Sequence, residues 1–150
     1  MSKEANHTFE LCAYIDSLER KLDSMTGRID GCKATTEGHA GGYTILNNLK
    51  AQVQVATDRL QERCNIMKEQ LFVVKDNIKS KASEIVVESK KKGKAVLNKI
   101  SELFDVKDKL MGIREHVKES QKEVSATVYL TRVSETRYRV CNHTGSAQQS

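Results

Sequence analysis

The sequence contains no proline and no tryptophan among its 150 residues, and only 5% of the residues are aromatic. At the usual proline usage of about 5%, roughly seven prolines would be expected. Proline marks turns, strand edges and the first turns of helices, and the chain also has only 8 glycines. The chain therefore has few places where it must bend. This argues against a turn-rich β-sandwich or barrel and predicts an all-α protein built from a few long helices.

Signals for membrane insertion and export are also missing. No apolar run approaches the ~20 residues that span a bilayer, and the first residues lack the apolar core of a signal peptide. We therefore predict a cytoplasmic protein with no transmembrane segment. The cysteines are scattered without a C-x-x-C pair, and in that compartment we expect them to be reduced. They are Cys12, Cys32, Cys64 and Cys141.

The residue patterns of common catalytic and metal sites are missing as well. The four histidines lie far apart, and none has a cysteine or carboxylate at a spacing typical of a metal site. The Gly93-Lys94 pair does not form a phosphate-binding loop, because Glu88 and Ala95 stand where that loop needs a glycine and a hydroxyl residue. We therefore predict no catalytic residue, no metal, no cofactor and no enzymatic activity.

Apolar residues recur at a helical spacing along most of the sequence. Apolar residues at alternating spacings of three and four predict helices over residues 7–32, 44–104 and 105–140. Five of the 8 glycines fall between residues 27 and 42, which predicts a loop there. Gly93 is the position where the middle helix could kink, giving four helices instead of three. We expect one helical domain over residues 1–143 and a disordered tail over 144–150.

The apolar positions define a helix-packing seam. In the middle stretch, Ala56, Leu60 and Cys64 are separated by two successive spacings of four, which resembles a coiled-coil stutter. Beyond Val117 the seam continues through Gln121, Val124, Val128, Thr131, Glu135 and Tyr138, where its polar members weaken it. The residues that we expect to carry the seam are Leu11, Ile15, Leu18, Leu22, Met25, Ile29, Leu60, Met67, Leu71, Val74, Ile78, Ile100, Leu103, Leu110, Ile113 and Val117.

The predicted helix lengths suggest how the helices pair. The first helix would fold back on the start of the long middle helix and the last on its end, as elongated antiparallel hairpins in a coiled-coil-like bundle. Much of the seam would then have only one partner, and pairs of helices bury little area. We therefore expect either a dimer or a bend at Gly93 that brings the two ends together.

Basic charge is concentrated in one segment. The formal net charge of the chain is +5, and residues 75–118, with twelve basic and seven acidic side chains, have the same net charge of +5. The densest point is formed by Lys90, Lys91, Lys92 and Lys94. Three interpretations remain open: a solvated helix face, contact with nucleic-acid phosphates, or an amphipathic helix on an anionic membrane.

The same region carries a family resemblance. The stretch over residues 78–117, with its core at residues 89–100 followed by 103–110, resembles an uncharacterised helical domain of clostridial and related Firmicutes proteins found in mobile and conjugative elements. That family has no assigned function, so the resemblance implies no functional residue. It implies a bacterial, mobile-element context in which a DNA-adjacent or assembly role would fit.

Two functional hypotheses follow. In the first, the chain is a non-enzymatic interaction or scaffold protein that assembles through its seam, either with itself as a homodimer or larger oligomer, or with another helical protein. In the second, it binds nucleic acid or an anionic membrane surface weakly and without sequence specificity, through the lysines at 90–94.

Overall fold

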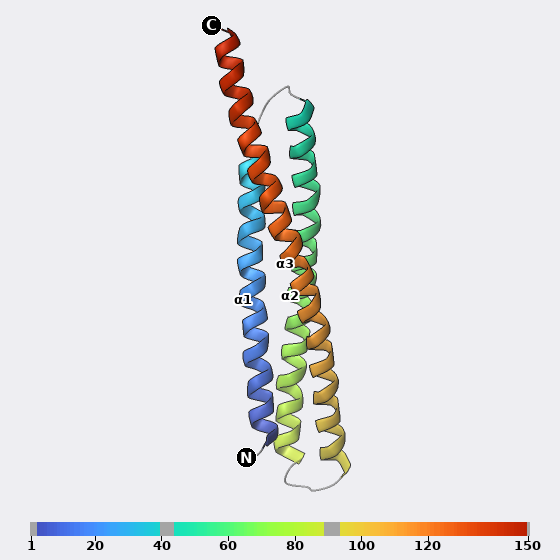
Figure 1. Ribbon diagram of the computed structural model, residues 1–150. Coiled ribbons are helices and arrows are strands. Elements are labelled where there is room, and N and C mark those ends of the chain that lie inside the picture. The colour runs from blue at the N-terminus through green and yellow to red at the C-terminus, as the bar shows by residue number, and fades with distance from the viewer. Residues whose placement is uncertain (1–2, 40–43, 89–93, 150) are drawn as a thin grey trace. The chain divides into compact units, whose positions relative to one another are not determined.

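The computed structural model contains three α-helices in chain order (Figure 1): α1, Lys3–Glu37; α2, Thr44–Glu88; and α3, Lys94–Gln149. It describes the backbone of residues 3–39, 44–88 and 94–149, and the side chains of residues 10–39, 46–81 and 105–142. These backbone segments contain no strand. The predicted all-α class is confirmed.

The second helix boundary differs from the prediction. α2 ends at Glu88 instead of residue 104, and α3 begins at Lys94 instead of residue 105. The apolar spacing of three and four continues through this region, so periodicity alone cannot locate a break between two helices of the same phase. Asp105, where the last helix was predicted to begin, lies on the exposed surface inside α3. Gly93, the predicted kink, lies outside the described residues.

The C-terminal end also differs from the prediction. α3 continues to Gln149, although a disordered tail was expected over residues 144–150. No proline interrupts this stretch, and Gly145 alone costs about 1 kcal/mol in a helix relative to alanine. Polar composition led to the expectation of disorder, but polar residues do not by themselves end a helix.

Each helix contributes one part to each of two compact units. Unit 1 consists of Met1–Leu22 and Asn65–Lys118, and unit 2 consists of Asp23–Cys64 and Glu119–Ser150. Both units therefore contain a segment of α1, of α2 and of α3, where the sequence suggested one domain over residues 1–143. The expected return of the last helix along the middle one is found in unit 1, and α3 also continues into unit 2, so each unit packs segments of three helices instead of two.

The core of unit 1 is apolar throughout its described part. Its buried side chains come from all three helices, and the described seam residues of this unit are among them. Burying a leucine or isoleucine side chain stabilises a fold by about 1.5–3 kcal/mol. The buried residues are Leu11, Ile15, Leu18, Leu22, Met67, Leu71, Val74, Ile78, Val106, Leu110, Ile113 and Val117. The seam residues Ile100 and Leu103 have side chains outside the described set.

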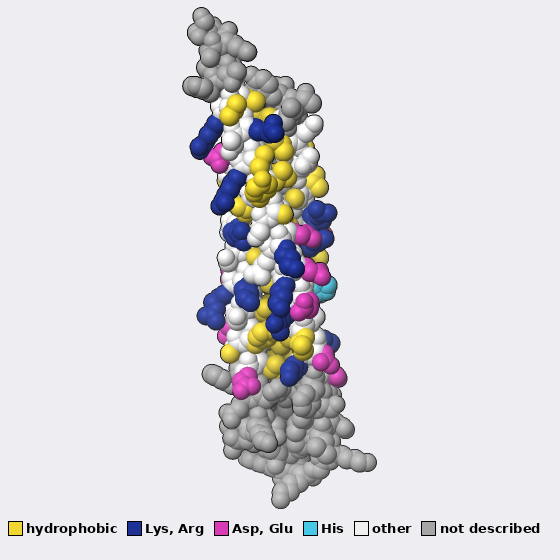
Figure 2. Space-filling view, viewed as in Figure 1, with side chains coloured by type: hydrophobic (Ala, Val, Ile, Leu, Met, Phe, Trp, Pro, Cys, Tyr) yellow, Lys and Arg dark blue, Asp and Glu magenta, His cyan; other side chains and the backbone are white. Residues whose placement is uncertain are grey.

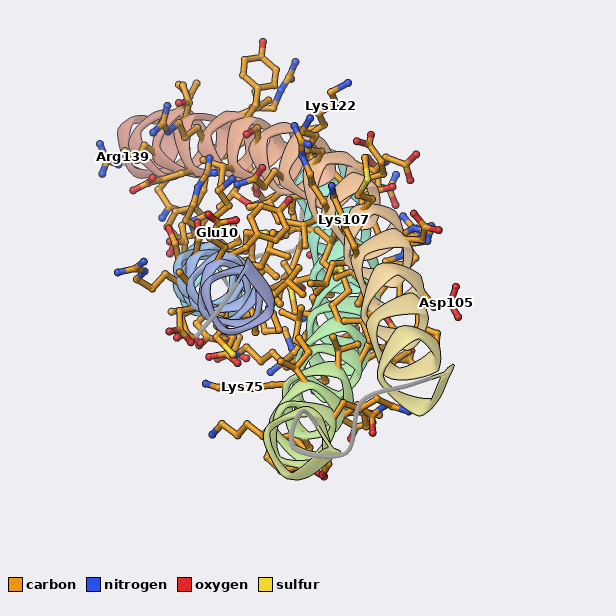
Figure 3. The ribbon with its side chains drawn as sticks, turned by 90° about the horizontal axis from the view of Figure 1, so that it is seen from below. Glu10, Lys75, Asp105, Lys107, Lys122 and Arg139 are labelled. Atoms are coloured by element: carbon orange, nitrogen blue, oxygen red, sulfur yellow. The ribbon has the colours of Figure 1, made fainter. Side chains whose placement is uncertain are left out.

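An ion-pair cluster lies on the surface of unit 1. Lys75 lies on the side of α2 that faces α1 (Figure 3). Its Nζ is 3.2 Å from Asp16 Oδ1 and 3.9 Å from Glu19 Oε2. The hydrogen bond to Asp16 and the charge of Glu19 raise the pKa of Lys75. These contacts add a polar link at the margin of the apolar packing between α1 and α2.

The core of unit 2 is mixed. Met25, Ile29, Leu60 and Val124 are buried, together with other apolar residues of the three segments. Polar side chains are buried beside them: Thr36, His39, Thr57, Ser120, Thr127, Thr131 and Ser134. Ion pairs lie at the edges of this unit, with Lys33 Nζ at 3.0 Å from Asp58 Oδ1 and Arg63 Nη1 at 2.5 Å from Glu123 Oε2. The core of unit 2 therefore combines apolar and hydroxyl side chains.

The buried threonines correct the predicted phase of two stretches. Thr57 is buried, whereas Ala56 is only half-buried. The spacing from Val53 through Thr57 to Leu60 is therefore a regular four and three, and the predicted stutter is wrong. On α3, Thr127 is buried in place of Val128. Ala56 and Val128 were predicted at these seam positions because they are apolar. The helical period instead places Thr57 and Thr127 in the core.

The exposed faces of the helices carry the charges. On the face that Figure 2 shows, acidic and basic side chains are interspersed with hydrophobic ones. This is the distribution expected where each helix packs along one stripe and leaves the rest of its surface to water.

Candidate functional site: a groove between α2 and α3

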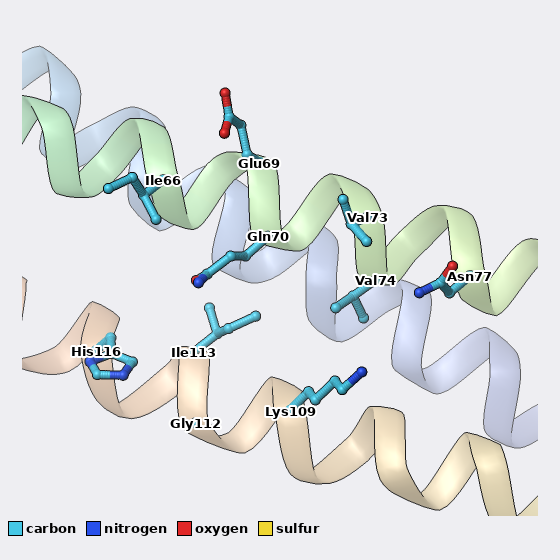
Figure 4. Close-up of a pocket in the computed structure, with 10 residues that line it drawn as sticks. All are labelled: Ile66, Glu69, Gln70, Val73, Val74, Asn77, Lys109, Gly112, Ile113 and His116. Atoms are coloured by element: carbon cyan, nitrogen blue, oxygen red, sulfur yellow. The ribbon is translucent and has the colours of Figure 1, made fainter.

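A groove with a volume of about 530 Å³ lies between α2 and α3 in unit 1 (Figure 4). The two helices contribute side chains that follow one another at spacings of three and four, so each set lies along one stripe of its helix. The lining residues are Ile66, Glu69, Gln70, Val73, Val74 and Asn77 from α2, and Lys109, Gly112, Ile113 and His116 from α3.

The floor and walls of the groove are apolar. Val74 and Ile113 are buried between the helices, with 6% and 7% of their surfaces exposed. Ile66 and Val73 remain 47% and 55% exposed. Two large apolar side chains are therefore left to solvent beside an apolar floor, an arrangement that costs free energy unless a partner covers it.

Gly112 opens the groove on the α3 side. A Cβ built at this position would have no neighbouring atom within 4 Å. A larger residue here would project into open space, so the glycine leaves room between the helices without being required by the backbone. Glycine inside a helix costs about 1 kcal/mol relative to alanine. The sequence therefore gives up helix stability at a position that lines the groove.

The charged rim distinguishes the two ends of the groove. Lys109 and Asn77 lie at one end, and His116 and Ile66 lie at the other (Figure 4). Glu69 is on α2, opposite in charge to Lys109 on α3. Neither of these two residues forms an ion pair with another described residue. In Figure 4 the carboxylate of Glu69 points away from α3, whereas Lys109 lies between the two helices.

Sequence reasoning did not identify this groove. Ile66 and Val73 carry the signal that could have found it, because both are apolar and lie outside the predicted seam of α2. Their separation of seven residues places them on one face of the helix. That α3 lies beside this face, with a glycine at position 112, cannot be read from the sequence.

A second polar cluster lies in unit 2 around His39. This residue is 6% exposed, and its ring stacks on Tyr138 with a centroid distance of 4.5 Å and an interplanar angle of 19°. Its Nδ1 is 3.4 Å from Ser134 Oγ. Its backbone N–H donates to the Thr36 carbonyl at 3.1 Å, and Lys50 Nζ donates to the His39 carbonyl at 3.3 Å. His39 thus joins the end of α1 to α2 and to the C-terminal half of α3.

The surroundings of His39 favour its neutral form. Burial lowers the pKa of the imidazole, and the nearby charges of Lys50 and Arg139 lower it further, while Glu135 opposes the shift. Ser134 is fully buried, with 0% exposure, so no substrate can reach the hydroxyl that faces the ring. The pair therefore supports the packing of unit 2 and is not arranged as a nucleophile and base.

The structure places the other predicted site residues as follows. The seam residues with described side chains are buried inside the units, so they stabilise the fold and offer no surface to an external partner. Lys90, Lys91 and Lys92 lie outside the described residues. Lys94 begins α3, but its side chain is not among those described.

Two further findings limit the kinds of site. In the part of the chain that the structure describes, no group of three or more histidine, cysteine or carboxylate side chains could hold a metal ion. Within the same part, no helix combines the length and the apolar character needed to cross a bilayer.

The described residues form an all-α fold of three helices, with an apolar, partly charged surface groove in unit 1. The chain belongs to a family of unknown function, DUF6674, whose model matches residues 1–144. The resemblance to an uncharacterised family is confirmed at that level, and the match covers far more than residues 78–117. No curated protein and no solved structure matches the chain.

Proposed function

We propose that this protein is a non-enzymatic helical interaction protein and that the groove between α2 and α3 is its binding surface. The observation that carries this proposal is the exposure of Ile66 and Val73 beside the open position at Gly112. An amphipathic helix that buries its apolar face in a groove is a recurring mode of recognition. The lining residues supply an apolar floor and a polar rim that such a helix requires.

In this proposal the partner binds at the groove and not at the seam, where the sequence had suggested assembly. The seam leucines and isoleucines are buried within each unit, so assembly through them would require the units to open. The groove needs no such opening. We expect the interaction to take place in the cytoplasm, where the four free cysteines would stay reduced.

A photo-crosslinking experiment tests the groove directly. Benzoylphenylalanine replaces Val73 in one variant and Val55 in a matched control, and both variants are irradiated inside the source cells. Val55 is a suitable control because it is an α2 valine, 64% exposed, in unit 2. We expect position 73 to give one adduct of defined mass whose partner mass spectrometry identifies, with the crosslink on a helix of that partner.

The control determines how the result is interpreted. An adduct at position 73 that is absent at position 55 supports the groove. Equal adducts at both positions, or none at position 73, would contradict the proposed binding surface. Circular dichroism of both variants checks that each remains helical.

The lysines at 90–94 support a second candidate function. Residues 75–118 have a net charge of +5, which equals that of the whole chain, and lysines contact phosphates as point charges without reading sequence. The bacterial mobile-element context suggested by the family resemblance would suit contact with DNA. Changing Lys90, Lys91, Lys92 and Lys94 to glutamine should then abolish binding to duplex DNA or to phosphatidylserine vesicles, with helicity unchanged.

Salt separates this candidate from the first one. Binding through phosphate contacts weakens steeply between 50 and 200 mM salt, by about tenfold or more for a few contacts. Wild-type protein that binds neither DNA nor vesicles at 50 mM salt would rule out the lysine cluster as a binding surface. DNA and vesicles, tested in separate samples, distinguish a nucleic acid from a membrane.

A further inference from the structure

We propose that the occupant of the groove is an amphipathic helix of another protein that carries an aspartate or glutamate beside its apolar stripe, and that Lys109 and Asn77 bind this carboxylate. This inference rests on the proposed function, because it names the chemistry of the partner at the same surface. The polar side chains that face the space between α2 and α3 carry it (Figure 4).

The charge that faces this space is positive. Lys109 lies between the two helices, whereas the carboxylate of Glu69 points away from α3 (Figure 4). Glu69 is the only acidic residue among those that line the groove. The lining residues therefore direct a cation, and no carboxylate, toward an occupant. Charged groups across an interface are favourable when their signs are opposite, so the occupant should be acidic at this place.

Two side chains at the same end of the groove can donate hydrogen bonds to one group. Lys109 on α3 and Asn77 on α2 lie at this end (Figure 4). Neither side chain forms an ion pair or a hydrogen bond with another described residue. A carboxylate has two acceptor oxygens, and its bonds to a charged donor are among the strong hydrogen bonds. An ammonium and an amide on facing helices are thus complementary to a carboxylate and unfavourable for a cation.

The apolar residues indicate that this carboxylate belongs to a helix. Ile66 and Val73 are exposed at a separation of two helical turns, about 10 Å along α2, and Asn77 lies one turn beyond Val73. Such a strip matches the apolar stripe of an amphipathic helix. A partner helix that lies along it advances about 6 Å in four residues. Its carboxylate should therefore be three or four residues from the residue that contacts Val73.

Charge reversal at Lys109 tests this contact, with the photo-crosslinker at position 73 as the probe. Benzoylphenylalanine at Val73 is combined with Lys109→Glu or Lys109→Arg, and each variant is irradiated inside the source cells. Lys109→Glu brings like charges together, so we expect the yield of the adduct to fall about tenfold. Lys109→Arg keeps the positive charge and should retain most of the adduct. Mass spectrometry should find an aspartate or glutamate three or four residues from the crosslinked residue of the partner.

Lys107→Glu is the matched control for net charge. Lys107 lies on α3 at an exposed position that does not line the groove, so its reversal should leave the yield unchanged. An equal loss of adduct for Lys107→Glu and Lys109→Glu would contradict the inference. Circular dichroism of each variant confirms that a loss of adduct is not a loss of structure.

The remaining outcomes distinguish this inference from the proposed function. If a partner helix is captured equally well by Lys109→Glu, or has no acidic residue at those spacings, the carboxylate contact is wrong and the groove remains a binding surface. An adduct with a second copy of this chain or with a lipid would contradict the assigned occupant. If position 73 gives no adduct in any variant, both this inference and the proposed function fail.

Discussion

The two units are built from the same three helices, but their cores differ in chemistry. The described core of unit 1 is apolar, whereas unit 2 buries threonine, serine and histidine beside its apolar residues. In the described part of the chain, the threonine hydroxyls of unit 2 bond carbonyls four residues earlier on their own helices. Thr57 reaches Val53 at 2.8 Å, and Thr131 reaches Thr127 at 2.8 Å. The same helical period therefore runs through two cores that are stabilised by different kinds of side chain.

The comparison concerns the stability of each unit and the place of the proposed binding surface. Unit 1 fills its core with apolar side chains and still has Ile66 and Val73 left exposed at the groove. In unit 2 the buried threonine hydroxyls donate to carbonyls of their own helices, so they are not left as unpaired buried groups. They contribute less apolar burial than leucine or isoleucine would. We infer that unit 1 gains a larger part of its stability from apolar burial than unit 2 does.

The largest effect is expected from a charge placed in the core of unit 1. Leu71 is fully buried, and Leu71→Asp both removes apolar burial and buries a carboxylate. We expect a loss of about 4 kcal/mol or more in the free energy of unfolding, measured by urea unfolding and circular dichroism. Val55→Asp, at an exposed site, should cost about 0.5 kcal/mol or less. An unchanged melting curve for Leu71→Asp would contradict the assigned core.

The next effect compares two open glycines, one in each unit. A Cβ at Gly112 or at Gly27 would meet no atom within 4 Å, so alanine at either site should stabilise its helix by about 1 kcal/mol. Both substitutions are measured by urea unfolding. Gly112→Ala should in addition lower the yield of the crosslink at position 73, whereas Gly27→Ala in unit 2 should not. Equal crosslink yields for both variants would show that the open space at Gly112 is not used.

A smaller effect is expected from the polar core of unit 2. In Thr57→Val the hydroxyl is lost, but the Val53 carbonyl keeps its helical hydrogen bond. We expect the free energy of unfolding to stay the same or to rise by about 0.5 kcal/mol. The reverse type of change in unit 1, Val74→Thr, should destabilise the fold by about 1 kcal/mol, because it buries a hydroxyl in an apolar core. A large loss for Thr57→Val would mean that the threonine has a specific role.

The smallest expected effect is a pH dependence of the free energy of unfolding that arises from His39. Burial lowers its pKa in the folded protein below the ordinary value of about 6.5 that applies to the unfolded chain. The stability from this group is therefore complete above pH 6.5 and is lost as pH falls through the folded pKa. From pH 8 to pH 5.5, the free energy of unfolding, measured with urea, should decrease less for His39→Gln than for wild type. Equal decreases would contradict the burial of a neutral imidazole.

The sequence allowed much of the fold to be predicted, for a definite reason. Leu18, Leu71 and Leu110 repeat at spacings that only a helix places on one face, so their burial follows from the sequence. Thr57 and Thr127 share that period but are polar, so the predicted seam was shifted by one position, to Ala56 and to Val128. Gly93 marked a possible break in the middle helix, but the apolar period continues across it, so the start of the last helix was predicted at residue 105 instead of Lys94.

The groove and the His39 cluster depend on tertiary contacts that no local pattern contains. His39 meets Ser134 and Tyr138 across a separation of 95 residues or more along the chain. Gly112 lines a groove because α2 passes beside it, and in the sequence it is only a glycine within a helix. Exposed apolar residues outside the seam, such as Ile66 and Val73, were the available signal.

The local bonding of the threonine hydroxyls has a mechanical consequence. Because Thr57, Thr127 and Thr131 bond carbonyls of their own helices, sliding one helix of unit 2 along another breaks none of these bonds. A pulling force along the helices would therefore meet little resistance from them. Under axial load, we expect the contacts of His39 with α2 and α3, and not the threonine hydroxyls, to resist sliding of the helices in unit 2.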